Sequence, residues 1–365
     1  MDSLKEARQK INIIDREMAK LFSERMECAK IIADYKKERG LAIYDKARED
    51  EVIKTNSEYV SDPVMREYYV QFLKNTMAVS RDFQSRLMAG ARVAYSGTRG
   101  AFAHIAATKC FPNSERIAYP DFAAAYAAVE NGECDVAVLP IENSYNGDVG
   151  QVCDLLFSGS LYVNAVTELA VTHDLVCLPD ADISDIKEVI SHPQAIAQCS
   201  NFIREHNFIA REYVNTALAA EYVKNCNDKS IAAIASAEAA QIFGLKVIAR
   251  EINTSKTNTT KFVILSRAES RHSSSEMGVH TMLLFTVRNE AGALAKAIDI
   301  IGKHGFNMRT LRSRPMKELL WQYYFYVEAE GNVHTYEGAT MMAELDKYCD
   351  SLKNVGTYTK KLIGE

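Results

Sequence analysis

Apolar residues recur every three or four positions along the first 90 residues, which is the spacing of one face of an α-helix. The series that includes Leu4, Ile11 and Met18 predicts one very long helix. Glycine suits the position just after a helix, so we expect this helix to run to about Arg39 and to stop at Gly40.

Two further helices are expected in the same region. The second begins near Asp45, and the third follows Asp62-Pro63 and runs to about Met88, because proline is favoured at the first position of a helix. Three helices, one of them this long, cannot bury their apolar faces within one chain. We therefore expect an all-α domain over residues 1–90 that forms a homodimer or a higher homo-oligomer.

From Arg92 the pattern changes to short apolar runs that alternate with helical stretches. The clearest runs are 92–95, 135–140, 188–190, 231–234 and 261–265. Such an alternation predicts an α/β domain over residues 91–270, with a mostly parallel sheet and with ligands at the ends of its strands.

The polar residues 268–278 indicate a linker, and the pattern changes again after it. The predicted elements are a strand (280–287), a helix (291–304), two strands (306–314 and 319–329), a helix (335–349) and a strand (352–360). This βαββαβ order is that of a ferredoxin-like α+β module, which we place at residues 278–365. Because that fold serves many functions, the order alone assigns none.

The composition excludes several classes of protein. Hydrophobic residues make up 47% and charged residues 25% of the 365-residue chain, which are ordinary globular values and exclude wholesale disorder. The chain has a net charge of −5 and so lacks the excess of positive charge that is typical of nucleic-acid-binding proteins. An anionic ligand must therefore be held by local clusters of arginine and lysine.

Cysteine spacing and the start of the chain bear on metals and location. No two of the 8 cysteines form a Cys-x-x-Cys pair, so we expect buried thiols in a reducing compartment and no metal site. The first residues contain no apolar signal region, and no run reaches about 18 apolar residues. We expect a cytoplasmic protein with no membrane partner.

Three basic residues of the long helix suggest a site for an anion. Arg25 and Lys36 are 11 positions apart, which places them nearly on one face and about 16 Å apart along the axis. Arg8 is about 25 Å from Arg25 and on another face, so it could serve the same ligand only from a partner chain. Ser80 and Gln84 share one face of the third helix.

Over residues 4–88 the sequence resembles the helical (AroQ-type) chorismate mutases. The matching motifs are Arg8-x₂-Ile11-x₃-Asp15, Glu24-Arg25, Lys36, Asp45-x₂-Arg48-Glu49 and Ser80-x₃-Gln84. The resemblance implies an all-helical dimer whose long helices cross between subunits, and the rearrangement of chorismate to prephenate without a cofactor. Such a pericyclic reaction needs a folded substrate conformer and donors aimed at the oxygen that gains charge.

The resemblance also implies roles for these residues. Arg8 of a partner subunit and Arg25 would hold the two carboxylates of chorismate, and Lys36 and Gln84 would hydrogen-bond its ether oxygen. The residues that would surround the ring hydroxyl and carboxylate are Asp45, Arg48, Glu49 and Ser80.

In the second region, polar clusters follow the predicted strands. They are 96–102, 140–144, 191–195, 198–200, 215–217 and 259–262. Gly97 and Gly100 permit a tight turn onto a helix N-terminus, where an anion can bind, but alone this signal is weak and favours a purely structural turn. His192 could be a general base or a structural residue of a turn.

These clusters together resemble prephenate dehydratase over residues 92–266, through the signatures Pro-Ile-Glu-Asn, Ser-His-Pro-Gln and Thr-x-Phe. The resemblance implies two α/β subdomains like those of a periplasmic binding protein, with the site in the cleft between them. It also implies decarboxylative dehydration of prephenate to phenylpyruvate without a metal or cofactor. Thr260 would donate to the departing ring hydroxyl once its neighbours polarise it. The residues that would bind the substrate are Asn143, Ser191, Gln198 and Thr216.

One position departs from this pattern. The usual Thr-Arg-Phe is Thr260-Lys261-Phe262 here. Lysine keeps the positive charge but lacks the planar fork of arginine, so we expect Lys261 to differ in how it positions its neighbours.

The C-terminal region resembles the ACT regulatory domain over residues 280–360, through Glu290–Leu294 and Leu311–Pro315. The resemblance implies that L-phenylalanine binds at an interface between two ACT domains. The residues that would bind it are Gly292, Ala293, Leu294, Ser313, Arg314 and Pro315. Arg312 replaces the usual glutamate, and this charge reversal would alter feedback if its side chain faces the ligand or the partner domain.

The three resemblances predict a bifunctional enzyme of phenylalanine biosynthesis, an isomerase and a carbon–oxygen lyase, inhibited by L-phenylalanine. Two alternatives stay open at this point. The cleft and the C-terminal module could belong to a solute sensor without catalysis, or the dehydratase could act on arogenate, the aminated analogue of prephenate. A sensor has no need of donors at an ether oxygen, which favours the enzyme.

Overall fold

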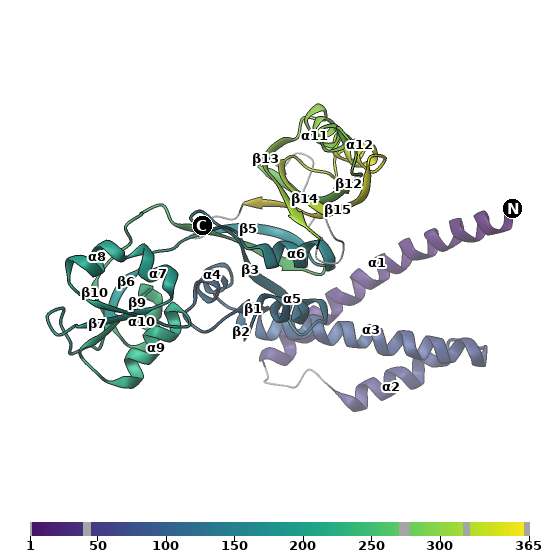
Figure 1. The fold of residues 1–365 in the computed structure, drawn as a ribbon. Coiled ribbons are helices and arrows are strands. Elements are labelled where there is room, and N and C mark those ends of the chain that lie inside the picture. Colours follow the sequence, from purple (N-terminus) through teal and green to yellow (C-terminus); the bar gives the residue numbers. More distant parts are fainter. Residues whose placement is uncertain (1, 39–44, 270–277, 317–321, 361–365) are drawn as a thin grey trace. The chain divides into compact units, whose positions relative to one another are not determined.

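The computed structural model describes residues 2–38, 45–269, 278–316 and 322–360 (Figure 1). The chain divides into two compact units. The first comprises Met1–Ala91 with Asn113–Glu115, and the second comprises Arg92–Pro112 with Arg116–Glu365.

The first unit is helical, as the apolar spacing predicted. Its helices are α1 (Asp2–Glu38), α2 (Lys46–Ser57) and α3 (Pro63–Ala89). Asp45 caps α2, because its side chain accepts a hydrogen bond from the Arg48 backbone N–H at 3.0 Å. Pro63 is the first residue of α3, and the predicted stop at Gly40 lies outside the described residues.

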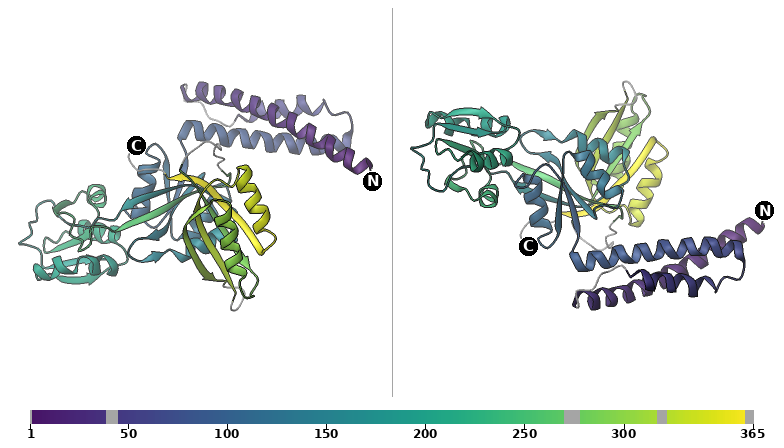
Figure 2. Two further views of the ribbon diagram at one scale, coloured as in Figure 1. Left: turned by 90° about the horizontal axis from the view of Figure 1, so that it is seen from above. Right: turned by 90° about the horizontal axis from the view of Figure 1, so that it is seen from below.

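The helices of the first unit pack on one another through small residues and leave their main apolar stripe uncovered. α1 and α2 both pack against α3 (Figure 2). The buried apolar side chains in the described part of this unit are Ala29, Ala33, Leu73 and Met77. In contrast, Leu4 is 60% exposed, Ile11 54% and Leu21 61%. One chain therefore cannot bury the stripe that defines its longest helix.

The second unit begins with a lobe in which helices flank a sheet. Its elements are β1 (Arg92–Ser96), α4 (Phe102–Cys110), β2 (Glu115–Tyr119), α5 (Phe122–Glu130), β3 (Val136–Asn143), β4 (Gly147–Asp148), α6 (Gly150–Ser158), β5 (Tyr162–Ala170) and β11 (Thr259–Ser266). Within the described residues these strands belong to a ten-stranded sheet with the order β13-β14-β12-β15-β5-β11-β3-β1-β2, in which β4 also pairs with β3.

The second lobe is inserted between β5 and β11. Its elements are β6 (Asp174–Cys177), β7 (Glu188–Ser191), α7 (Pro193–Gln198), α8 (Ser200–Glu205), β8 (Ile209–Glu212), α9 (Thr216–Cys226), β9 (Ile231–Ala235), α10 (Ala237–Phe243) and β10 (Lys246–Ala249). In the part of the chain that the structure describes, its strands form a five-stranded sheet with the order β10-β6-β9-β7-β8.

Both sheets are mixed, so the expectation of a mostly parallel sheet is wrong. β1 is parallel to β3, and β7 is parallel to β8 and β9. However, β11 is antiparallel to both β3 and β5, and β6 is antiparallel to β9 and β10. The reason is topological: the chain leaves the first lobe along β5 and returns beside it along β11, in the opposite direction.

The two connections between the lobes are hydrogen-bonded to each other. The Val171 N–H donates to the Asn258 carbonyl at 2.8 Å, and the Ile252 N–H donates to the His173 carbonyl at 2.8 Å. The outgoing and returning segments thus form a double connection at the base of the cleft.

The C-terminal module has the predicted βαββαβ order. It comprises β12 (Val279–Val287), α11 (Ala293–Lys303), β13 (Asn307–Pro315), β14 (Tyr323–Glu330), α12 (Tyr336–Leu345) and β15 (Cys349–Lys360). One face of its sheet packs under α11 and α12, with Phe285 and Val327 in that core (Figure 1). The other face carries Leu284 and Tyr326 into the core of the first lobe.

The module is joined to the first lobe through the backbone as well. β15 pairs in parallel with β5, with Thr359 opposite Ala165. At Gly356 a side chain would collide with the backbone carbonyl of Val163, so glycine permits this close approach. The sheet of the module and that of the first lobe are therefore continuous.

The structure also bears on the cysteines and on whether any helix could span a membrane. All eight cysteines lie in the described part of the chain and are free; the buried ones are Cys110, Cys134, Cys153, Cys177 and Cys199. No helix among the described residues is both long and apolar enough to cross a membrane.

Candidate active sites

Three of the residues predicted to bind the mutase substrate lie where α1 packs against α3. Arg25 is partly buried, and its Nη1 donates to the Thr76 carbonyl of α3 at 3.5 Å. Burial lowers the pKa of the Arg25 guanidinium. Ser80 and Gln84 follow one and two turns later on α3, and both are buried. Gln84 Oε1 has no hydrogen-bond partner among the described residues, so this oxygen is free to accept a hydrogen bond.

The residues at the start of α2 are only partly directed toward α3. Glu49 forms an ion pair with Arg81 of α3. Arg48 is exposed and pairs instead with Glu51 at 2.7 Å. Sequence reasoning missed Arg81, although it directly follows Ser80.

Arg8 stands apart from this cluster. Because α1 is continuous over Asp2–Glu38, the 17 residues between Arg8 and Arg25 correspond to about 25 Å. Arg8 is exposed, whereas Lys36 is partly buried. A single chain does not bring Arg8 to Arg25.

The second unit contains a cavity of about 550 Å³ lined by residues of both lobes. The predicted site residues that line it are Asn143, Gln198, Thr216 and Thr260. In the described part of the chain, no group of three or more His, Cys, Asp or Glu side chains could hold a metal ion.

Thr260 and Asn143 form the polar pair at the base of this cavity. They are opposite each other on β11 and β3, and Asn143 Nδ2 donates to Thr260 Oγ1 at 2.9 Å. Asn143 Oδ1 accepts from the backbone N–H groups of Tyr145 and Asn146, both at 3.0 Å, which fixes the orientation of the amide. Since Thr260 Oγ1 accepts from Asn143, its own proton is free to be donated to a ligand.

The N-termini of α9 and α4 form part of the cavity lining. Asn215 caps α9 by accepting from the Leu218 N–H at 2.7 Å, so that Thr216 is the first residue of the helix. Gly97 and Gly100 have φ values of +94° and +89°, which confirms the tight turn ahead of α4.

His192 caps α7, because its Nδ1 accepts from the Gln194 N–H at 3.3 Å, and the residue also lines the cavity. Ser191 is the one predicted dehydratase ligand that does not line the cavity. Its side chain is fully buried, and its hydroxyl donates to the Ile234 carbonyl at 2.6 Å. The alternation of side chains along β7 turns Ser191 into the second lobe's core. Two cavity residues that sequence reasoning missed are His173 and Asn258.

Comparisons with known proteins assign this arrangement. The prephenate dehydratase family model matches residues 93–270, and the chorismate mutase type II model matches residues 7–85. The bifunctional chorismate mutase/prephenate dehydratase of Neisseria gonorrhoeae is 30% identical over 359 residues, which cover 98% of this chain and 97% of the relative. The chain belongs to the bifunctional chorismate mutase/prephenate dehydratase family.

Two solved structures share the fold over about three quarters of the chain. Prephenate dehydratase from Arthrobacter aurescens in complex with L-Phe is 27% identical, with a TM-score of 0.68 over 73% of this chain and 89% of that one. A protein described as a novel type of quorum quenching acylase is 30% identical, with a TM-score of 0.69 over 74% of this chain and 98% of that one. The enzyme described here is a chorismate mutase and a prephenate dehydratase.

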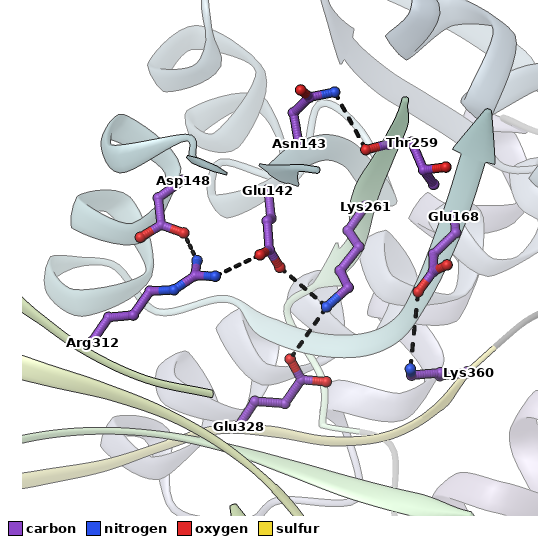
Figure 3. Close-up of polar contacts among 9 residues, drawn as sticks. All are labelled: Glu142, Asn143, Asp148, Glu168, Thr259, Lys261, Arg312, Glu328 and Lys360. Carbon is purple, nitrogen blue, oxygen red and sulfur yellow. Dashed lines mark hydrogen bonds and ion pairs between the residues drawn. The ribbon is translucent and has the colours of Figure 1, made fainter. Parts of the chain in front are cut away.

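The position at which this enzyme departs from the usual Thr-Arg-Phe motif belongs to a charge network behind the cleft (Figure 3). Because side chains alternate along β11, Thr260 faces the cavity and Lys261 faces away from it. Lys261 Nζ lies 3.1 Å from Glu142 and 3.9 Å from Glu328 of β14. Burial disfavours the ammonium, but the two carboxylates outweigh it and raise the pKa of Lys261.

Arg312, the second departure, joins the same network from β13. It pairs with Glu142 and with Asp148, and Asp148 also lines the cavity (Figure 3). The charge-reversed position therefore faces the dehydratase lobe of its own chain. Burial opposes ionisation of Glu142, but Arg312 and Lys261 outweigh it and hold its pKa below the ordinary value.

We predict that Glu142→Gln lowers the free energy of unfolding of the second unit by about 1–2 kcal/mol at pH 7, because Arg312 and Lys261 lose a shared partner. The pKa of Glu142 is depressed in the folded state, so its stabilisation is present above the ordinary pKa of 4.5 and is lost as pH falls through the lowered value. Urea unfolding of both proteins at several pH values measures the difference.

Glu168→Gln is the matched control. Its partner Lys360 lies 3.9 Å away, and both side chains are about half exposed, so we expect a change within about 0.5 kcal/mol. A Glu142→Gln variant as stable as the parent at pH 7, or a difference that widens on acidification, would contradict the prediction.

Proposed function

We propose that the enzyme converts chorismate to prephenate in the helical unit and prephenate to phenylpyruvate in the cleft, and that L-phenylalanine inhibits the second step through the C-terminal module. We assign this module as an ACT domain. The observation that supports the cleft chemistry most directly is the oriented hydrogen bond from Asn143 to Thr260.

In the mutase unit, Arg25 holds one substrate carboxylate, and Gln84 with Lys36 stabilises the ether oxygen as its C–O bond breaks. No proton moves in this rearrangement, so fixed donors are sufficient. Arg8 completes the site from a second copy of the chain. The exposed stripe along α1 supports such a homodimer, because burying it requires another chain.

In the cleft, loss of CO₂ from the ring carbon of prephenate sends its bonding electrons into the ring, and the ring hydroxyl departs from the opposite carbon. Thr260 donates its proton to that hydroxyl, so water leaves, and the threonine regains a proton from solvent. Asn143 polarises Thr260 by donating to its oxygen. Gln198 and Thr216 hold the substrate carboxylates from the second lobe.

The proposed phenylalanine site lies at one end of the module's sheet. β12 and β13 both pair antiparallel with β14, so the turn at Gly292 and the end of β13 at Pro315 lie at the same end. The other proposed ligands are Ala293, Leu294, Ser313 and Arg314. Arg314 is already anchored to Asp154 of the first lobe at 3.2 Å and to the Tyr324 hydroxyl at 3.1 Å.

Arg312 supplies the physical link from this site to the cleft. It lies two residues before Arg314 on β13 and contacts Asp148 in the cavity wall. A shift of β13 on phenylalanine binding would therefore move a residue of the substrate site. That a relative of this fold was solved as a complex with L-Phe supports the choice of effector.

For the mutase, we predict that Arg8→Ala and Lys36→Ala each lower chorismate turnover by about 10²-fold, because each removes one donor from a preorganised site. Co-expression of the two variant chains should restore about a quarter of the activity, because half of the dimers then hold one intact site of two. Dehydration of added prephenate is the internal control. A mixture as inactive as its components would contradict a site shared between chains.

For the dehydratase, we predict that Thr260→Val, supplied with chorismate alone, accumulates prephenate, with dehydration slowed at least about 100-fold. Thr259→Val, on the same strand but outside the cavity lining, should form phenylpyruvate normally. Rapid phenylpyruvate formation by Thr260→Val would refute its role. Faster turnover of arogenate than of prephenate by the parent enzyme would refute the substrate assignment.

For regulation, we predict that L-phenylalanine binds the parent enzyme and inhibits dehydration, and that Arg312→Gln binds it within about threefold of the parent affinity but is inhibited far less. Allosteric coupling of this kind commonly changes affinity by about 5–150-fold. Calorimetry measures binding, and prephenate turnover measures inhibition. Equal inhibition of both proteins would contradict this route, and absence of phenylalanine binding would contradict the effector.

A further inference from the structure

We infer that His173 and Asn258 are positioning residues for the dehydratase reaction. Together they hold Gln198 of the second lobe in register with the Asn143–Thr260 pair of the first lobe. The inference rests on the roles proposed above for those three residues.

His173 presents a single hydrogen-bond donor to Gln198. Its side chain is 3% exposed, and its Nε2 lies 3.0 Å from Gln198 Oε1. An amide oxygen only accepts, so Nε2 carries the proton. Burial lowers the pKa of His173 to about 4, so the ring is neutral at neutral pH and has no second donor. Its edge contact with Phe102, at 5.8 Å between ring centroids, holds the ring in place.

Asn258 connects the two lobes through both ends of its amide. Its Nδ2 donates to Gln198 Oε1 at 3.0 Å, and its Oδ1 accepts from Asn143 Nδ2 at 2.8 Å. The side chain is buried, and its backbone carbonyl accepts from Val171 at 2.8 Å. The residue is thus fixed in backbone and side chain alike.

These two hydrogen bonds fix the orientation of the Gln198 side-chain amide. Its Oε1 accepts from both His173 and Asn258, and its NH₂ makes no hydrogen bond to the described residues. Gln198 lines the cavity, so both amide protons remain for an anionic substrate group. Without the two donors, the terminal amide could turn over and present oxygen to that group, which would repel it.

The positions of the two residues in the fold explain why they can do this. His173 follows β5 on the outgoing connection, and Asn258 precedes β11 on the returning one. The hydrogen bonds of His173 and Asn258 therefore span the double connection. They position Gln198 of the second lobe relative to Thr260 of the first lobe. His173 contacts only Gln198, whereas Asn258 contacts both Gln198 and Asn143. Substitutions at the two positions should therefore have different kinetic effects.

The test is steady-state kinetics with prephenate in the full-length enzyme. Phe at position 173 keeps the ring but removes the donor, so His173→Phe should raise KM about tenfold with kcat within about twofold. His173→Gln retains an N–H near the Nε2 position and should restore KM to within about threefold. Asn258→Leu should raise KM and also lower kcat about tenfold, because Asn143 loses one of the acceptors that orient its amide toward Thr260.

Two controls keep the outcomes distinct. Urea unfolding of the second unit, in which all three positions lie, reports whether each variant folds, and His280→Phe removes a different buried histidine, on β12, which should leave KM and kcat unchanged. The inference is overturned if His173→Phe leaves KM unchanged, if the Gln and Phe variants behave alike, or if Asn258→Leu lowers kcat no more than His173→Phe. Thr260→Val separately tests the roles proposed for Asn143, Gln198 and Thr260. Full dehydratase activity of that variant would refute those roles, independently of the result at His173.

Discussion

The antiparallel pairing of β11 between β3 and β5 is the constraint on which the second unit depends. It places Thr260 opposite Asn143, and so creates the donor pair of the cleft. It also brings the outgoing and returning connections side by side, where His173 and Asn258 lie. Because side chains alternate along one strand, the same pairing turns Lys261 toward the C-terminal module. Thr260 and the charge network of Lys261 thus lie on opposite faces of β11.

Much of the architecture could be predicted from local patterns. The 3.6-residue spacing in the first region determines where α1 and α3 lie, and the short apolar runs mark β1, β3, β7, β9 and β11. The mixed sheets could not be predicted in this way, because apolar runs do not show direction. The direction of β11 follows from the return of the chain across the cleft after residues 171–258, which is a property of topology rather than of local sequence.

The residues of the candidate sites differ in the same way: some could be predicted from local sequence, and others depend on the fold. Asn143 and Thr260 stand out in the sequence because each lies in a distinctive motif at a strand end, and Gln198 begins a polar cluster that follows the Ser-His-Pro-Gln motif. His173 and Asn258 carry no such signal, since each acts on a neighbour that is distant in sequence. Ser191 is the reverse case: its motif is conspicuous, but its hydroxyl donates to the Ile234 carbonyl and the residue does not line the cavity. Arg312 could be noticed as a charge reversal, yet its partners Glu142 and Asp148 are visible only in the fold.

The continuous sheet has a consequence for how this chain could evolve or be engineered. Leu284, Tyr324 and Tyr326 of the module belong to the same core as Ala137 and Leu156 of the first lobe. A chain shortened to end before β12 would expose an apolar face and leave β5 with an unprotected edge, which is a surface prone to aggregation. Removal of the module would therefore damage the lobe that carries Asn143 and Thr260.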